Sequence, residues 1–142
     1  MFQENKRNKR LSLAFTLVML VFIWGNSCMP GEESSEVSSF VAEVLARIFG
    51  DSVLQATFVI RKLAHFTEFA LLGFFVRWSG VLRRWPLAQA VLWSLLAAMA
   101  DETIQLFVPG RAGMLRDVWI DFSGVLVGTG ILTLLHKRAK KS

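Results

Sequence analysis

The length of the uncharged apolar segments is the strongest constraint on the fold of this chain. Residues Leu11–Met29 form a run of 19 residues without a charge, and Trp85–Ala100 form another of 16. A helix of about 20 apolar residues crosses about 30 Å of hydrocarbon. Backbone exposed to lipid must bond within its own segment. The segments therefore predict an integral membrane protein built of α-helices.

The chain has room for about four such spans, three of which also carry charged residues, and they predict an all-α fold, a four-helix transmembrane bundle. We place the spans at about 11–29, 56–78, 86–106 and 117–135, between a basic N-terminal segment at 1–10 and a basic tail at 136–142. A cleaved signal peptide is the alternative for the first segment, but its length favours an uncleaved span. Gly124 and Gly128 in the last segment form a small-xxx-small pattern, which predicts close helix packing within the bundle.

The acidic stretch Gly31–Asp51 separates the first two spans. Within it Val37, Val41, Val44 and Ile48 recur at helical spacing, which predicts a short amphipathic helix. Such a helix either lies on the membrane surface, packs on the bundle or merely connects two spans. We prefer the connector.

The basic residues are arranged as a topology signal. Eleven of the 16 Lys and Arg fall in three clusters, at 6–10, 77–84 and 137–141. A four-span alternation puts all three clusters on one side, and the positive-inside rule makes that side cytoplasmic. Both termini are then cytoplasmic, and the lipid bilayer is the partner. A nucleic-acid partner is not expected, because the clusters flank spans and lack a base-stacking pattern. A single cysteine, Cys28, excludes an internal disulfide.

Polar groups interrupt the apolar pattern at one membrane depth. In the four-span topology, three stretches bring polar side chains at helical spacing toward the outer leaflet: Arg61, His65 and Glu68; Asp101 and Gln105; Asp117 and Asp121. A charge in hydrocarbon is costly unless it is paired or hydrated, so these side chains are expected to face the bundle interior. The sequence therefore predicts one polar centre that is open to the outside.

Several of these segments resemble the VanZ-like family. They are KLAHFTEFALLG, DETIQLFVPGR and DVWIDFSGVLVG, preceded by FIWGNS and PGEESS, and they occur in order over roughly residues 18–130. The resemblance implies a small multi-span protein of the bacterial cytoplasmic membrane, and the founding member of the family is linked to teicoplanin resistance. The positions that match are Lys62, His65, Glu68, Asp101, Glu102, Gln105, Pro109, Gly110, Arg111, Asp117 and Asp121. Family members often have Asn where Asp121 stands, so this chain carries an additional acid.

The polar residues support two kinds of site. His65, Glu68, Asp101 and Glu102 could perform acid–base catalysis or hold a divalent metal ion whose identity is open. The alternative, which we favour, is an ion-pair network that joins spans two, three and four.

The second set suits an anionic ligand. It comprises Lys62, Gln105, Arg111, Arg116, Asp117 and Asp121. An arginine fork matches phosphate or carboxylate, and the headgroup of a lipid-linked cell-wall precursor carries both outside the membrane. The alternative is that Arg111 pairs with Asp117 or Glu68.

Three functions follow as hypotheses, and the oligomeric state stays open. The leading one is an envelope protein that lowers susceptibility to lipoglycopeptides such as teicoplanin by engaging an anionic headgroup. The second is an intramembrane hydrolase or transferase, with or without a metal, that acts on a lipid-linked substrate with His65 or Glu68 as the base. The weakest is an ion-coupled transporter, because LLGFFV and VLWSLLAAMA offer no polar path toward the cytoplasm.

Overall fold

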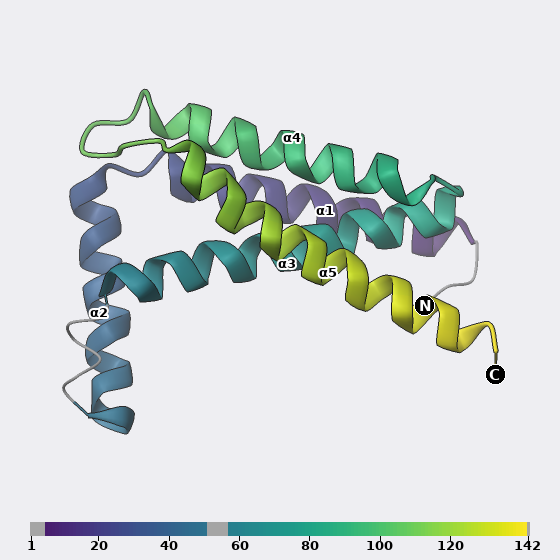
Figure 1. Ribbon diagram of the computed structural model, residues 1–142, viewed down its shortest axis with the longest axis horizontal. Coiled ribbons are helices and arrows are strands. Elements are labelled where there is room, and N and C mark those ends of the chain that lie inside the picture. The colour runs from purple at the N-terminus through teal and green to yellow at the C-terminus, as the bar shows by residue number, and fades with distance from the viewer. Residues whose placement is uncertain (1–4, 51–56, 142) are drawn as a thin grey trace.

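The computed structural model describes residues 5–50 and 57–141, and its only regular elements there are helices joined by short loops (Figure 1). The helices are α1 (Lys6–Ser27), α2 (Gly31–Phe49), α3 (Thr57–Arg83), α4 (Leu87–Gln105) and α5 (Leu115–Ala139). The all-α prediction is confirmed. Each expected span contains a helix, and α2 is the short helix expected between the first two. Parts of the predicted segments lie outside the described residues, namely residues 1–4, Asp51, Ala56 and Ser142.

The helix ends follow from local sequence. The side chain of Asn5 caps α1 by accepting a hydrogen bond of 2.7 Å from the backbone N–H of Asn8. Pro86 immediately precedes α4, where its fixed φ suits a helix start. Gly110 has a φ of +72°, which favours glycine and turns the chain between α4 and α5.

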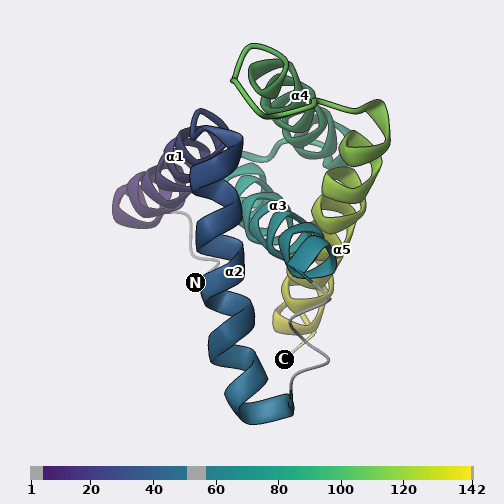
Figure 2. The ribbon, with the colours of Figure 1, turned by 90° about the vertical axis from the view of Figure 1, so that its left-hand side faces the viewer.

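Four helices run along the long axis of the molecule, and α2 stands across one end (Figures 1 and 2). α3 is the central element, because it contacts each of the other four helices. The start of α1 and the end of α5 both lie at the end of the bundle opposite α2 (Figure 1). The core between these helices is apolar and includes Phe69, Leu72 and Val125, all fully buried.

Three helices, α1, α4 and α5, are long and apolar enough to cross a membrane. Their outward faces expose large apolar side chains such as Val21, Leu92 and Leu134, as expected of surfaces that meet lipid. α3 is longer, at 27 residues, but it contains charges such as Arg61 and Glu68 and is not among the three. The chain therefore has the character of a membrane protein, and the predicted count of four spans is not confirmed by length and composition.

Glycines bring α3 and α5 into close contact. A Cβ atom added to Gly128 would lie 1.8 Å from the backbone oxygen of Ala70, and one added to Gly124 would lie 2.3 Å from that of Phe66. Any side chain at either position would collide with the backbone of α3. The predicted close packing within the bundle is confirmed.

We expect Gly128→Val to destabilise the protein by about 1–3 kcal/mol, because α5 must move away from α3 to admit the side chain. Thermal unfolding of the detergent-solubilised protein measures this loss. Gly130→Ala is the matched control on the same helix, because a Cβ at Gly130 meets nothing within 4 Å. Equal stability of the Gly128→Val and Gly130→Ala proteins would contradict the close contact.

α2 is fixed to the bundle at its first residue. The backbone N–H of Gly31 donates to the carbonyl of Pro109 at 3.0 Å, in the loop between α4 and α5. Farther along α2, Ala42 is buried, whereas Val37, Phe40 and Ile48 remain more than half exposed. α2 therefore packs on the bundle through small residues and leaves an apolar stripe uncovered.

Candidate functional site

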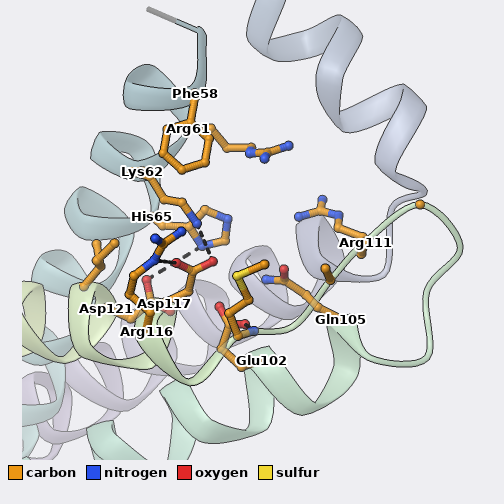
Figure 3. Close-up of a pocket in the computed structure, with 14 residues that line it drawn as sticks. Phe58, Arg61, Lys62, His65, Glu102, Gln105, Arg111, Arg116, Asp117 and Asp121 are labelled. Atoms are coloured by element: carbon orange, nitrogen blue, oxygen red, sulfur yellow. Dashed lines mark hydrogen bonds and ion pairs between the residues drawn. The ribbon is translucent and has the colours of Figure 1, made fainter.

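Polar side chains gather at the end of the bundle that α2 crosses. There α3, α4 and α5 meet the loop at 106–114 around a cavity of about 180 Å³ (Figure 3). Eight of the ten residues singled out in the sequence line it: Lys62, His65, Glu102, Gln105, Arg111, Arg116, Asp117 and Asp121. Asp101 lies buried behind the cavity wall, and Glu68 lines a neighbouring cavity.

Asp101 is fully buried on α4, and both of its carboxylate oxygens accept hydrogen bonds. Ser27, the last residue of α1, donates its hydroxyl at 2.6 Å, and Gln105 donates its amide at 2.9 Å. Gln105 also donates to the Ser27 oxygen at 3.2 Å. The spacing of Asp101 and Gln105 correctly indicated a pair on one helical face. Ser27 was not singled out from the sequence, although it lies in the FIWGNS segment that carries the family resemblance.

Replacing Ser27 by alanine removes the donor to a buried carboxylate oxygen. We expect a loss of about 1–3 kcal/mol in the free energy of unfolding, measured by thermal or denaturant unfolding in detergent. Ser35→Ala serves as the control, because the exposed Ser35 bonds only within α2. If the two variants were equally stable, the Ser27 bond would contribute nothing.

An ion pair joins α3 to α5 at the cavity. The ammonium of Lys62 donates to a carboxylate oxygen of Asp117, with both side chains mostly buried. Arg116 lies 4.0 Å from the other oxygen of Asp117 but is 70% exposed, so its attraction is largely screened by solvent. Figure 3 shows Lys62 and His65 of α3 facing Asp117 and Asp121 of α5. One ion pair of the expected network, between Lys62 and Asp117, therefore joins α3 to α5, and among the described residues no lysine or arginine pairs with an acid of α4.

Two of the predicted acids, Glu68 and Glu102, accept hydrogen bonds from other segments of the chain. Glu68 accepts a hydrogen bond of 3.4 Å from the side chain of Asn26 on α1. Glu102 accepts one of 2.8 Å from the backbone N–H of Met114, just before α5. Glu68 and Glu102 thus tie neighbouring segments to the bundle; each lines a cavity together with His65, but among the described residues neither lies at ion-pair distance from it.

His65 lies near two buried aspartates, Asp101 and Asp121. Its Nδ1 atom lies 3.9 Å from Asp101 Oδ2 and 3.9 Å from Asp121 Oδ1. These separations are too long for hydrogen bonds. His65 Nδ1 and Asp121 Oδ2 are both buried and have no hydrogen-bond partner within the described ranges.

Arg111 is positioned by backbone carbonyls. Its guanidinium donates to the carbonyl of Met29 at 3.1 Å and to that of Asn26 at 2.8 Å, at the C-terminal end of α1 where the helix dipole is negative. Burial lowers the pKa of the Arg111 guanidinium. The alternative pairing of Arg111 with Asp117 or Glu68 is not found among residues 5–50 and 57–141.

The match to a known family covers most of the chain. The sequence profile described as VanZ/LLP1 matches residues 12–136. The chain belongs to the VanZ/LLP1 family. No curated protein and no solved structure matches it.

The segments that carry the VanZ/LLP1 resemblance come from all five helices and the loop between α4 and α5. KLAHFTEFALLG lies on α3, DETIQ ends α4, and DVWIDFSGVLVG lies on α5. The Pro109–Gly110 turn between them aims Arg111 toward the end of α1. In this family member the cavity is lined by basic side chains together with buried carboxylates, a combination suited to binding an anion, a cation or both.

Proposed function

We propose that this VanZ-like membrane protein binds an anionic headgroup of the bacterial envelope and thereby lowers susceptibility to lipoglycopeptides such as teicoplanin. The orientation of Arg111 carries the proposal. A guanidinium has five N–H donors, and the carbonyls of Met29 and Asn26 accept two of them. The remaining donors are available to a ligand in the cavity, since Arg111 lines it. Phosphate and carboxylate match such a fork.

The charges around the cavity favour a headgroup that carries several negative groups. Arg61, Lys62 and Arg116 line the cavity together with Arg111. A lipid-linked cell-wall precursor offers a pyrophosphate and a peptide carboxylate on the outer face of the membrane. A precursor whose headgroup occupies the cavity would be shielded from a drug that is itself anchored in the bilayer.

The four-span topology belongs to the same proposal, with α3 as the additional crossing. The start of α1, the turn at 84–86 and the end of α5 share one end of the bundle, and the cavity lies at the other (Figure 1). The positive-inside rule makes the basic end cytoplasmic, so the cavity opens outward from the bacterial cytoplasmic membrane. Three crossings would instead place the two termini on opposite sides.

Cysteine labelling in intact cells tests this topology. In a Cys28→Ser background, we expect Glu43→Cys on α2 to react with a membrane-impermeant maleimide and Lys141→Cys to react only after lysis. Both positions are exposed in the structure, so burial within the protein does not protect them. Labelling of Lys141→Cys from outside would contradict the four-span topology.

Drug susceptibility tests the function. A susceptible Gram-positive host that expresses the wild-type chain should show a raised inhibitory concentration for teicoplanin and an unchanged one for vancomycin, because only teicoplanin carries the acyl chain. Immunoblotting of membranes confirms equal protein levels. Unchanged susceptibility to both drugs at normal protein levels would contradict the proposal.

One observation favours a second candidate, an intramembrane hydrolase or transferase that acts on a lipid-linked substrate. His65 lines the cavity with its Nδ1 atom unpaired within the described ranges and two carboxylates nearby. That arrangement suits a general base. Turnover of envelope lipids by the purified protein, lost in His65→Gln, would support this candidate over simple binding. An ion-coupled transporter is not favoured, because the described residues buried below the site are apolar, such as Leu72 and Val76, or carry only hydroxyl groups, such as Thr129.

A further inference from the structure

Three residues from three helices converge where α3, α4 and α5 meet. They are His65, Asp101 and Asp121, and one nitrogen or oxygen atom from each lies within 4.8 Å of the others. The aspartates are 0% and 1% exposed. The two distances from His65 Nδ1 are equal, at 3.9 Å, so the imidazole sits symmetrically between the carboxylates. They are slightly longer than the roughly 3.4 Å expected between ligand atoms of a tetrahedral Zn²⁺ site, so an inward movement of the side chains would bring three ligand atoms around one ion.

The polar atoms at this point are left unsatisfied. His65 Nδ1 and Asp121 Oδ2 are buried without hydrogen-bond partners in the described part of the chain. A buried polar atom without a partner is costly, and an unexplained one in a folded protein indicates a missing water or ion. A cation at the centre of the three side chains would give His65 Nδ1 a partner, and coordination by both oxygens of Asp121 would satisfy Oδ2 as well as Oδ1, which is the oxygen 3.9 Å from His65 Nδ1.

The charges of the two buried aspartates also favour a bound cation. Lys62 is paired with Asp117, and Arg111 donates to backbone carbonyls. Within residues 5–50 and 57–141, no lysine or arginine lies at ion-pair distance from Asp101 or Asp121. A divalent ion with these two carboxylates and a neutral imidazole gives a centre with no net charge, which suits burial among membrane helices.

We propose that His65, Asp101 and Asp121 bind one divalent transition-metal ion, Zn²⁺ or Mn²⁺, in the inner wall of the cavity. Imidazole and carboxylate are ligands for both ions. The carboxylate of Asp101 is oriented by Ser27 and Gln105, as the outer partners of a metal ligand orient it. Three protein ligands leave a coordination position open, and since His65 and Asp121 line the cavity, that position faces it.

The ligand set differs from the one suggested by the sequence. Glu68 and Glu102 bond elsewhere, and Asp121 takes their place. The metal content can be measured without drug or lipid, so failure of the metal proposal and failure of headgroup binding are distinguishable.

The test uses the full chain in detergent, stripped with a chelator and titrated separately with Mn²⁺ and Zn²⁺. We expect one ion per chain, measured by elemental analysis and by loss of the free Mn²⁺ signal in electron paramagnetic resonance, with a rise in melting temperature. Asp121→Asn and His65→Asn should each lose stoichiometric binding and the metal-dependent rise. Asp117→Asn is the matched control, because it removes one buried carboxylate of the same helix that pairs with Lys62, and it should retain the ion.

Absence of binding by the wild-type chain would overturn the proposal. So would Asp121→Asn and His65→Asn proteins that bind as the wild type does. Circular dichroism shows which variants fold. If one ligand variant is unfolded, the other ligand variant and the wild-type titration still decide the result.

Discussion

A chain carrying Arg111→Ala will insert and fold normally but will no longer raise the inhibitory concentration of teicoplanin. Arg111 supplies the guanidinium that lines the cavity, and its two bonds go to the end of α1, not to a carboxylate of the core. Its loss therefore removes the proposed headgroup contact and breaks no ion pair among the described residues. The measurement is the inhibitory concentration, with the membrane level of the protein determined by immunoblot.

Arg47→Ala provides the matched control. Arg47 is an exposed arginine on α2 that does not line the cavity, so its variant should protect as the wild type does. Full protection by Arg111→Ala would remove Arg111 from the binding site. Equal loss in the Arg111→Ala and Arg47→Ala chains would indicate a general effect of positive charge.

The largest expected effect on stability comes from breaking the pair between Lys62 and Asp117. Lys62→Met leaves the Asp117 carboxylate without its partner while the side chain of Asp117 is only 12% exposed. We expect a loss of about 2–3 kcal/mol in the free energy of unfolding, less than for a fully buried pair because both groups keep some contact with water. Chemical or thermal unfolding in detergent measures it.

Removing both partners tests whether the loss of stability comes from the unpaired charge or from the changed shape of the side chain. The Lys62→Met, Asp117→Leu double variant should recover most of the lost stability, since no unpaired charge is left. Lys137→Met, at an exposed position in the basic tail, should change the stability little. A double variant that is less stable than Lys62→Met would show that the pair is not the source of the loss.

The sequence was sufficient to predict the helices and the meeting of polar groups from three of them at one end of the bundle. Apolar runs of span length determine where α1, α4 and α5 lie, because lipid admits few other structures. Spacing of four residues placed Asp101 with Gln105 and Asp117 with Asp121 on common faces. Three separate helices then had to bring these faces together, because buried charges need partners.

The partner of each charge could not be predicted, because it depends on the rotation of each helix. Glu68 is three residues from His65 and was expected to share its site, but it faces Asn26 on α1. Arg111 was expected to meet a carboxylate as one alternative, but it bonds to backbone carbonyls, whose positions no residue type reveals. Ser27 is a small residue at a span end, and nothing in its identity marks it as the donor to Asp101.

The glycine pattern also predicts less than the structure shows. The pattern Gly124-xxx-Gly128 predicts that a helix approaches closely, but it does not say which helix. The approach to Phe66 and Ala70 fixes α5 against α3, and this contact brings Asp117 and Asp121 opposite Lys62 and His65.

The central claim is that the outward polar cavity binds an anionic headgroup, and direct binding tests it. The purified chain in lipid nanodiscs is titrated with a polyprenyl-pyrophosphate cell-wall precursor, alongside its Arg111→Ala and Arg47→Ala variants. We predict saturable binding by the wild-type and Arg47→Ala proteins and none by Arg111→Ala. No saturable binding by the wild type, or equal binding by all three proteins, would contradict the claim.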